Sequence, residues 1–151
     1  MKINRANAQR ADLLSLASGP LTCGGALTVI NIGGPPQAGD TFTLFSAAGY
    51  TNAFISTNLP SLASGLAWNV ASLNNGLLSV VSTEPVDITA WISKGALNLS
   101  WPADHTGWLL QAQTNGLANG WFNVPGSSLT NSLAIPVVVR NDCVFYRLIW
   151  R

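Results

Sequence analysis

The sequence predicts an all-β protein. Its apolar residues fall in short runs that Gly, Asn, Pro and Ser separate, and no stretch of a dozen residues keeps the i, i+3, i+4, i+7 spacing of an amphipathic helix. Several runs alternate between apolar and polar residues, as strands with one buried face do. With 48% hydrophobic and 9% charged residues, the 151-residue chain has enough apolar surface for one ordinary domain or two small ones.

Five strands are expected in the first half of the chain, with turns rich in Gly, Pro and Asn between them. Two of these strands, 26–32 (ALTVINI) and 77–82 (LLSVVS), carry apolar residues on both faces. Such runs are typical of strands that neighbours cover on both sides. The other three expected strands are 41–46 (TFTLFS), 53–57 (AFIST) and 66–70 (LAWNV).

A domain boundary is expected at the polar stretch 82–85, because its proline cannot donate to a strand ladder and the strands beyond it alternate more strictly. We therefore expect a β-rich first segment over 1–83, either a solenoid end or a sandwich-like unit, and a small antiparallel sandwich over 84–151. The alternating strands of the second segment are 96–101, 108–114 and 144–150.

Four aromatic residues are expected in the core, because each shares a strand face with aliphatic side chains. Trp68 alternates with Leu66 and Val70, and Tyr146 alternates with Leu148. The other two expected core residues, which alternate with leucines in the same way, are Trp101 and Trp108.

Charge excludes several classes of partner. Seven Lys and Arg against six Asp and Glu cannot form the long cationic face that phosphates require, so no nucleic-acid partner is expected. No run approaches the roughly 18 to 20 apolar residues of a membrane span. The N-terminal segment MKINRANAQR is polar and no signal-peptide core follows it, so this chain carries no recognisable export signal.

No catalytic or metal site is expected, and we predict a protein that is not an enzyme and holds no cofactor. His105 follows Asp104 in a turn, where adjacent side chains usually point apart, so we expect a solvated loop histidine. No Gly-x-Ser-x-Gly elbow surrounds any serine. A single His, two distant Cys and the lack of an Asp-rich loop argue against zinc and calcium. A glycosidase pair would have to come from six scattered carboxylates, three of them expected in turns: Asp12, Asp40, Glu84, Asp87, Asp104 and Asp142.

The two cysteines lie far apart in the sequence, so a bridge between them would close a long loop. Cys23 and Cys143 both flank apolar strands, where Cys packs as a small hydrophobic residue. We favour free, partly buried thiols, and the sequence leaves a disulfide open.

Three tryptophans are less constrained by strand patterns and are candidates for a ligand site: Trp91, Trp121 and Trp150. Exposed aromatic rings hold polysaccharides by stacking on sugar faces, and Asn and Gln nearby could bind hydroxyl groups. The alternative is that these rings cover the edges of a thin core.

Residues 13–82 resemble the C-terminal end of bacterial proteins with autotransporter-associated β-strand repeats. The segments that carry the resemblance are LTCGGALTVINIGG (21–34), AGDTFTLFSAAGY (38–50), FISTNLPSLASGLAWNVASL (54–73) and NGLLSVVST (75–83). The resemblance implies an exported, repetitive, solenoid-like surface protein of which this chain is the terminal part. It also implies that Met1 need not be the natural start.

Residues 86–151 resemble a shortened fibronectin type III-like module. LNLSWP (97–102) is similar to its second strand, Gly107-Trp108 stands where its third strand opens, and FYRL (145–148) is similar to a later strand with a buried tyrosine. A last strand has no residues to form it, so we expect either an open sheet edge or a covering segment from elsewhere.

Together these observations predict a non-catalytic extracellular or cell-surface module with structural or adhesive function. Its expected partners are upstream β-repeat units of the same polypeptide. The alternative prediction is a carbohydrate-binding module that uses the three peripheral tryptophans on an extracellular polysaccharide.

Overall fold

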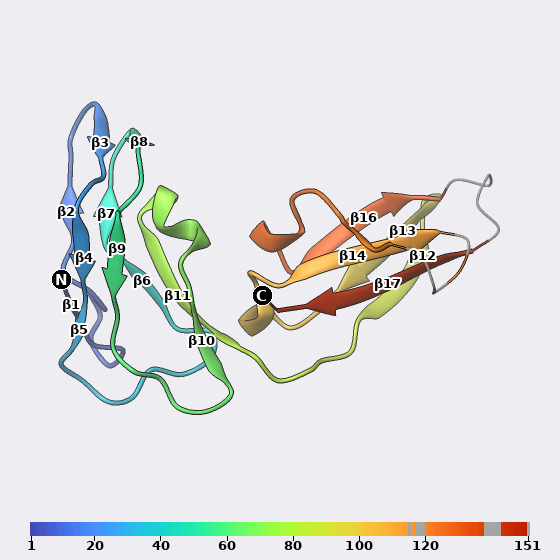
Figure 1. Ribbon diagram of the computed structural model, residues 1–151, viewed down its shortest axis with the longest axis horizontal. Coiled ribbons are helices and arrows are strands. Elements are labelled where there is room, and N and C mark those ends of the chain that lie inside the picture. Colours follow the sequence, from blue (N-terminus) through green and yellow to red (C-terminus); the bar gives the residue numbers. More distant parts are fainter. Residues whose placement is uncertain (115, 117–119, 138–142, 151) are drawn as a thin grey trace. The chain divides into compact units, whose positions relative to one another are not determined.

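The computed structural model describes residues 1–114, 116, 120–137 and 143–150. It confirms the all-β class: these residues form short strands and three short 3-10 helices, with no α-helix among them. The chain divides into two compact units, Met1–Ser82 and Thr83–Arg151, which are described separately below (Figure 1).

Residues 1–58 of the first unit form two stacked β-coils, the first coil (1–29) and the second coil (30–58). Each strand of the first coil pairs in parallel with one strand of the second, so that Lys2 lies beside Ile30 and Leu14 lies beside Phe45. The pairs are β1 (Lys2–Ile3) with β5 (Ile30–Asn31), β2 (Leu14–Ser15) with β7 (Phe45–Ser46), β3 (Pro20–Thr22) with β8 (Gly49–Thr51), and β4 (Ala26–Thr28) with β9 (Ser56–Asn58).

An antiparallel sheet completes the first unit. Its order is β10 (Leu66–Asn69), β11 (Leu77–Ser82) and β6 (Thr41–Thr43), and the 3-10 helix η1 (Ala71–Asn75) joins its first two strands. No residue of β11 is exposed, which confirms that neighbours cover both of its faces. For 26–32 the same expectation is wrong, because Ile30 and Ile32 point outward from the coil and are exposed.

The core of the first unit lies between the coils and this sheet. Trp68 packs against it as expected, with its ring 6.1 Å from that of Phe42 and its Nε1–H donating to the carbonyl of Pro60 at 2.8 Å. The buried members are Ile3, Ala11, Leu27, Val29, Phe42, Leu44, Phe45, Leu73, Leu78 and Val80.

A single buried carboxylate ties the first coil to the second. Asp40 accepts a hydrogen bond from Arg5 Nε at 2.7 Å and one from the backbone N–H of Gln37 at 2.8 Å, and Arg10 lies 3.6 Å away. Burial alone would raise the pKa of Asp40, but the hydrogen bonds from Arg5 and Gln37 and the two positive charges together hold it below 3.8.

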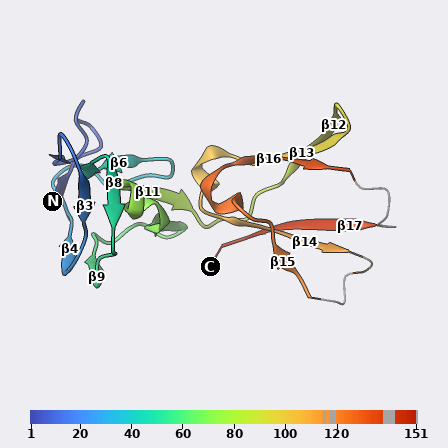
Figure 2. The same ribbon diagram turned by 90° about the horizontal axis from the view of Figure 1, so that it is seen from above.

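The second unit is a sandwich of two three-stranded antiparallel sheets, seen edge-on in Figure 2. One sheet has the order β12 (Thr89–Ser93), β13 (Ala96–Ser100), β16 (Ser132–Pro136), and the other has the order β15 (Phe122–Asn123), β14 (Leu109–Thr114), β17 (Val144–Ile149). Two further 3-10 helices, η2 (Ala103–His105) and η3 (Ser127–Leu129), lie in the connections.

The sandwich core is thin. Its fully buried centre is Leu99, Trp101 and Leu110, and Tyr146 and Leu148 pack against it from β17. Trp108 is also buried. Trp101, Trp108 and Tyr146 therefore lie where the strand alternation predicts.

The outer face of β14 differs from the expectation of a solvated face, because Gln111 and Gln113 are buried. Gln111 donates from Nε2 to Asn123 Oδ1 at 2.9 Å and accepts from Arg147 Nε at 2.9 Å. The Arg147 guanidinium in turn lies 4.2 Å from the centre of the Trp121 ring. A polar cluster therefore covers this face. The alternation of apolar and polar residues along β14 alone does not predict it, because its other members come from neighbouring segments.

Replacing Asp40 with Asn should lower the free energy of unfolding of the first unit by about 1.5 to 3 kcal/mol, because hydrogen bonds between charged groups are lost. In the unchanged chain the folded-state pKa of Asp40 is lowered, so its stabilising contribution is complete above the unfolded value near 3.8 and is lost as the pH falls through the folded value. Urea unfolding at pH 7 and pH 3 measures both effects, and Asp40→Asn should show the weaker pH dependence. Equal pH dependence of the two chains would contradict this account.

Gly76→Ala should destabilise the first unit by about 2 kcal/mol or more. Gly76 has φ +76°, a methyl group there would overlap the carbonyl group of Phe45, and the Gly76 carbonyl accepts from Leu44 N–H at 2.8 Å. The matched control is Gly95→Ala, which has the same φ but open space around the new methyl group. Chemical unfolding should show a cost of only about 1 kcal/mol for the control, and equal costs would refute the steric explanation.

Candidate functional site at the open end of the first coil

The first coil exposes apolar residues whose counterparts in the second coil are buried. Leu14 is the ladder partner of Phe45, and the same register places Leu13 on Leu44. Leu44 and Phe45 are 0% and 6% exposed, whereas Leu13 and Leu14 are 45% and 46% exposed. The first coil covers the second coil at this position, and nothing in the described part of the chain covers the first.

The backbone of the first coil is also unpaired on this side. Leu14 and Leu16 donate their N–H groups to Leu44 and Ser46 of the second coil, so the N–H of Ser15 between them faces away from it. On β3, Cys23 N–H donates to Thr51, so Thr22 faces away in the same manner. Among the described residues, β2 and β3 each have one ladder partner only.

One corner of this surface is closed. The segment 10–12 folds back along β1, where Asn4 N–H donates to the Arg10 carbonyl at 2.8 Å and Asp12 N–H donates to the Lys2 carbonyl at 2.9 Å. Pro20, which has no N–H, stands at the start of β3. We call the remaining surface the open end: the side chains of Leu13, Leu14 and Leu16 and the outer edges of β2 and β3.

The sequence carries a signal for this site. LLSLA (13–17) and LFSAA (44–48) are similar segments, and their offset along the chain is the one that separates the ladder partners Leu14 and Phe45. Apolar–polar alternation does not reveal the pairing of these segments, because β2 and β7 contain only two residues each, too few to show a period.

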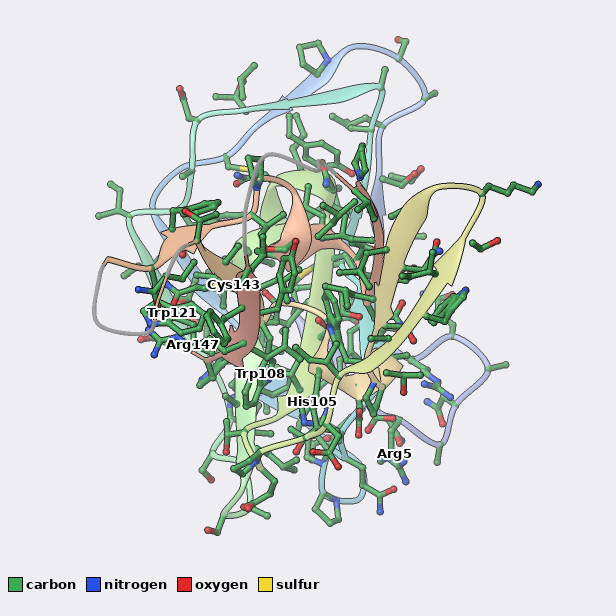
Figure 3. The ribbon with its side chains drawn as sticks, turned by 90° about the vertical axis from the view of Figure 1, so that its right-hand side faces the viewer. Arg5, His105, Trp108, Trp121, Cys143 and Arg147 are labelled. Carbon is green, nitrogen blue, oxygen red and sulfur yellow. The ribbon has the colours of Figure 1, made fainter. Side chains whose placement is uncertain are left out.

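The structure does not gather the three candidate tryptophans on one surface. Trp91 lies on β12 of the first sheet and is 47% exposed. Trp121 stacks with Arg147 beside the second sheet (Figure 3), and the Trp150 ring packs 6.3 Å from that of buried Trp108. Trp91 borders a shallow groove of about 210 Å³ with Asn98 and Ser132.

His105 is not a solvated loop residue, and this expectation is wrong. It is 5% exposed, its Nδ1 lies 2.7 Å from Asp104 Oδ1, and its Nε2 lies 2.9 Å from the carbonyl oxygen of Glu84. The 3-10 turn of η2 points the two adjacent side chains together, and the imidazole packs 5.0 Å from the Trp108 ring (Figure 3). Because a carbonyl only accepts, Nε2 is a donor here. The ring anchors the segment that enters the sandwich, and both nitrogens are engaged.

The other chemically active side chains do not form a cluster. Among the described residues no three of His, Cys, Asp and Glu lie together as metal ligands would. Asp12 accepts from Lys2 N–H at 2.8 Å, and Asp142 lies outside the described residues. Both cysteines are free thiols. Cys23 is buried, but Cys143 is exposed, so the expectation that it is partly buried is wrong.

The chain has no significant match among protein-family models, curated proteins or solved structures. In the described part of the chain, no helix has the length and apolar character that a membrane-spanning helix needs.

Proposed function

We propose that the chain is a non-catalytic structural module of a larger secreted or cell-surface β-repeat protein, and that its open end stacks on a further β-coil of the same polypeptide. The observation that carries the proposal is the contrast between buried Leu44 and Phe45 and their exposed counterparts Leu13 and Leu14. The resemblance of residues 13–82 to autotransporter-associated repeats supports the same assignment and suggests an extracellular location.

Physical reasons favour a coil as the occupant of the open end. A repeat unit of short strands cannot bury its apolar face alone, so neighbouring units stack to form a continuous core. The two coils of this chain already show that mode of stacking, with parallel ladders and matching apolar positions. A further coil of similar length would continue both the ladder and the core.

The side chains that could perform chemistry support a structural function, because they are engaged in holding the fold. Asp40 is ion-paired to Arg5, and the two nitrogens of His105 contact Asp104 and a backbone carbonyl.

The proposal is tested by repeating the segment 1–28 once in front of Met1. A duplicated segment with these bounds keeps the sequence spacing of the ladder partners Lys2 and Ile30, so the added copies of β2 and β3 can lie in register beside the original strands, while segment 10–12 still covers the outer edge of β1. We expect the original Leu13 and Leu14 to become buried, which should raise the free energy of unfolding by about 2 to 3 kcal/mol. The amides of Ser15 and Thr22 should become protected from hydrogen exchange.

The matched control carries proline at the added copies of Leu14 and Leu16, the positions whose N–H groups donate to the next coil. It should give neither the stabilisation nor the protection. An added coil that is digested by protease while Ser15 and Thr22 exchange at their original rates would overturn the proposal.

A second candidate function, binding of an extracellular polysaccharide, is favoured by the setting of Trp91. Its half-exposed indole stands beside a groove that Asn98 and Ser132 also line, and an aromatic ring with polar side chains beside it is the combination that holds a sugar ring by stacking and hydrogen bonds. Trp121 lacks this freedom, because Arg147 covers one side of its ring.

Titration of the intrinsic tryptophan fluorescence with a panel of soluble polysaccharides tests this candidate. A saturable change should be abolished by Trp91→Ala and retained by the control Trp121→Ala. A change that survives Trp91→Ala, or no change with any polymer, would remove the glycan site from consideration.

A further inference from the structure

The edge strand β12 is uncovered on the face that points to the interior of the sandwich. Its register pairs Ala90 with Leu99 and Ile92 with Leu97, so all four side chains lie on the core side of the sheet. Leu99 is buried and Leu97 packs against the core, but every residue of β12 is exposed and Ile92 is 74% exposed. The apolar underside of this strand therefore has no strand of the second sheet beneath it.

The strand β17 has a free edge. On the neighbouring strand β14, the N–H and the carbonyl of Leu110 both point away from β17, toward β15. The N–H donates to Ser127 Oγ, and the carbonyl accepts from the N–H of Val124. Backbone groups alternate along a strand, so Gln111 faces β17 and bonds its ladder partner Arg147. The N–H and carbonyl groups of Tyr146 and Leu148 then point outward, and β17 pairs only with β14 among the described strands.

An apolar cavity of about 490 Å³ lies between the two sheets. Residues of all six strands of the sandwich line it, among them Ile92 of β12 and Val144 and Tyr146 of β17. β12 and β17 overlap in the view of Figure 1, and Figure 2 shows that they belong to different layers of the sandwich. The cavity between the sheets thus reaches both the uncovered apolar face of β12 and the strand with the free backbone edge.

We propose that the free edge of β17 and the core-facing side of β12 form a docking site for an extended strand of another polypeptide. This strand pairs with β17 and packs against the core-facing side of β12. Such strand addition obtains its affinity from main-chain hydrogen bonds and its specificity from alternate side chains. The partner is a segment of about six residues, the length of β17. Every second side chain is apolar and packs against Ala90 and Ile92, and the others are polar and face water.

The width of the uncovered strip favours a single strand over a second copy of this chain. Only β12 is uncovered, because the next strand, β13, already packs on the core through Leu97 and Leu99. A second copy that paired through its own β17 would bring its whole first sheet to the place where β12 lies. The proposal concerns the second unit alone and does not depend on the coil stacking proposed above.

The test appends a flexible Gly-Ser linker and the strand Thr-Val-Thr-Val-Thr-Val to the full chain after Arg151. Amide hydrogen exchange is then measured by NMR. We expect exchange at Tyr146 and Leu148 to slow at least tenfold, with little change at Arg147, whose N–H is already in the ladder. A control in which prolines replace the three threonines of the appended strand should leave Tyr146 and Leu148 unprotected.

A second pair of variants tests the apolar underside of β12. Ile92→Asp in the extended chain should remove most of the added protection, and the chain should stay folded because this side chain is largely exposed. The matched control Ile32→Asp changes another exposed isoleucine, in the first unit, and should leave the protection intact.

Two results would overturn the proposal. One is unchanged exchange at Tyr146 and Leu148 in a folded chain that carries the appended strand. The other is a stable dimer of the original chain, detected by sedimentation, in which these two amides are already protected, because that result assigns the edge to a second copy.

Discussion

Short strands need neighbours, and this constraint governs both units of the protein. Its strands contain two to six residues, too few to be stable unless another segment pairs with their edges and covers their apolar side. The coils meet the constraint by stacking in parallel, so that Leu13 and Leu14 cover Leu44 and Phe45. The sandwich meets it by facing two sheets around Leu99, Trp101 and Leu110.

Hydrogen bonds of buried polar side chains fix the loops and turns that lie outside the strand ladders. Asp40 joins the loop around Arg5 to the turn at Gln37, and His105 joins the η2 turn to the carbonyl of Glu84. The two proposed sites lie where the strand constraint is unmet, at the open end and beside β17, and at both places apolar side chains accompany unpaired backbone.

Local patterns predicted some of the antiparallel strands closely but gave no expectation for β12, β15 or β16. The expected strand 77–82 is β11, and the expected strands 96–101, 108–114 and 144–150 differ from β13, β14 and β17 by a residue at one end. The parallel coils could not be predicted from such patterns. Very short strands such as β1 and β2 show no period of apolar residues, and their ladder partners lie a whole coil further along the chain. The burial of Gln113 and of His105 was missed for a related reason, since cover from distant segments decides it.

Residue-resolved amide hydrogen exchange of the unmodified chain tests most directly the central claim, that each unit has a strand margin where unpaired backbone accompanies exposed apolar side chains. The account predicts an alternation within single strands: fast exchange at Ser15, Thr22, Tyr146 and Leu148, whose N–H groups face outward, and slow exchange at their paired neighbours Leu16, Cys23 and Arg147. Uniform protection along β2, β3 and β17 would show that both margins are already covered and would contradict the account.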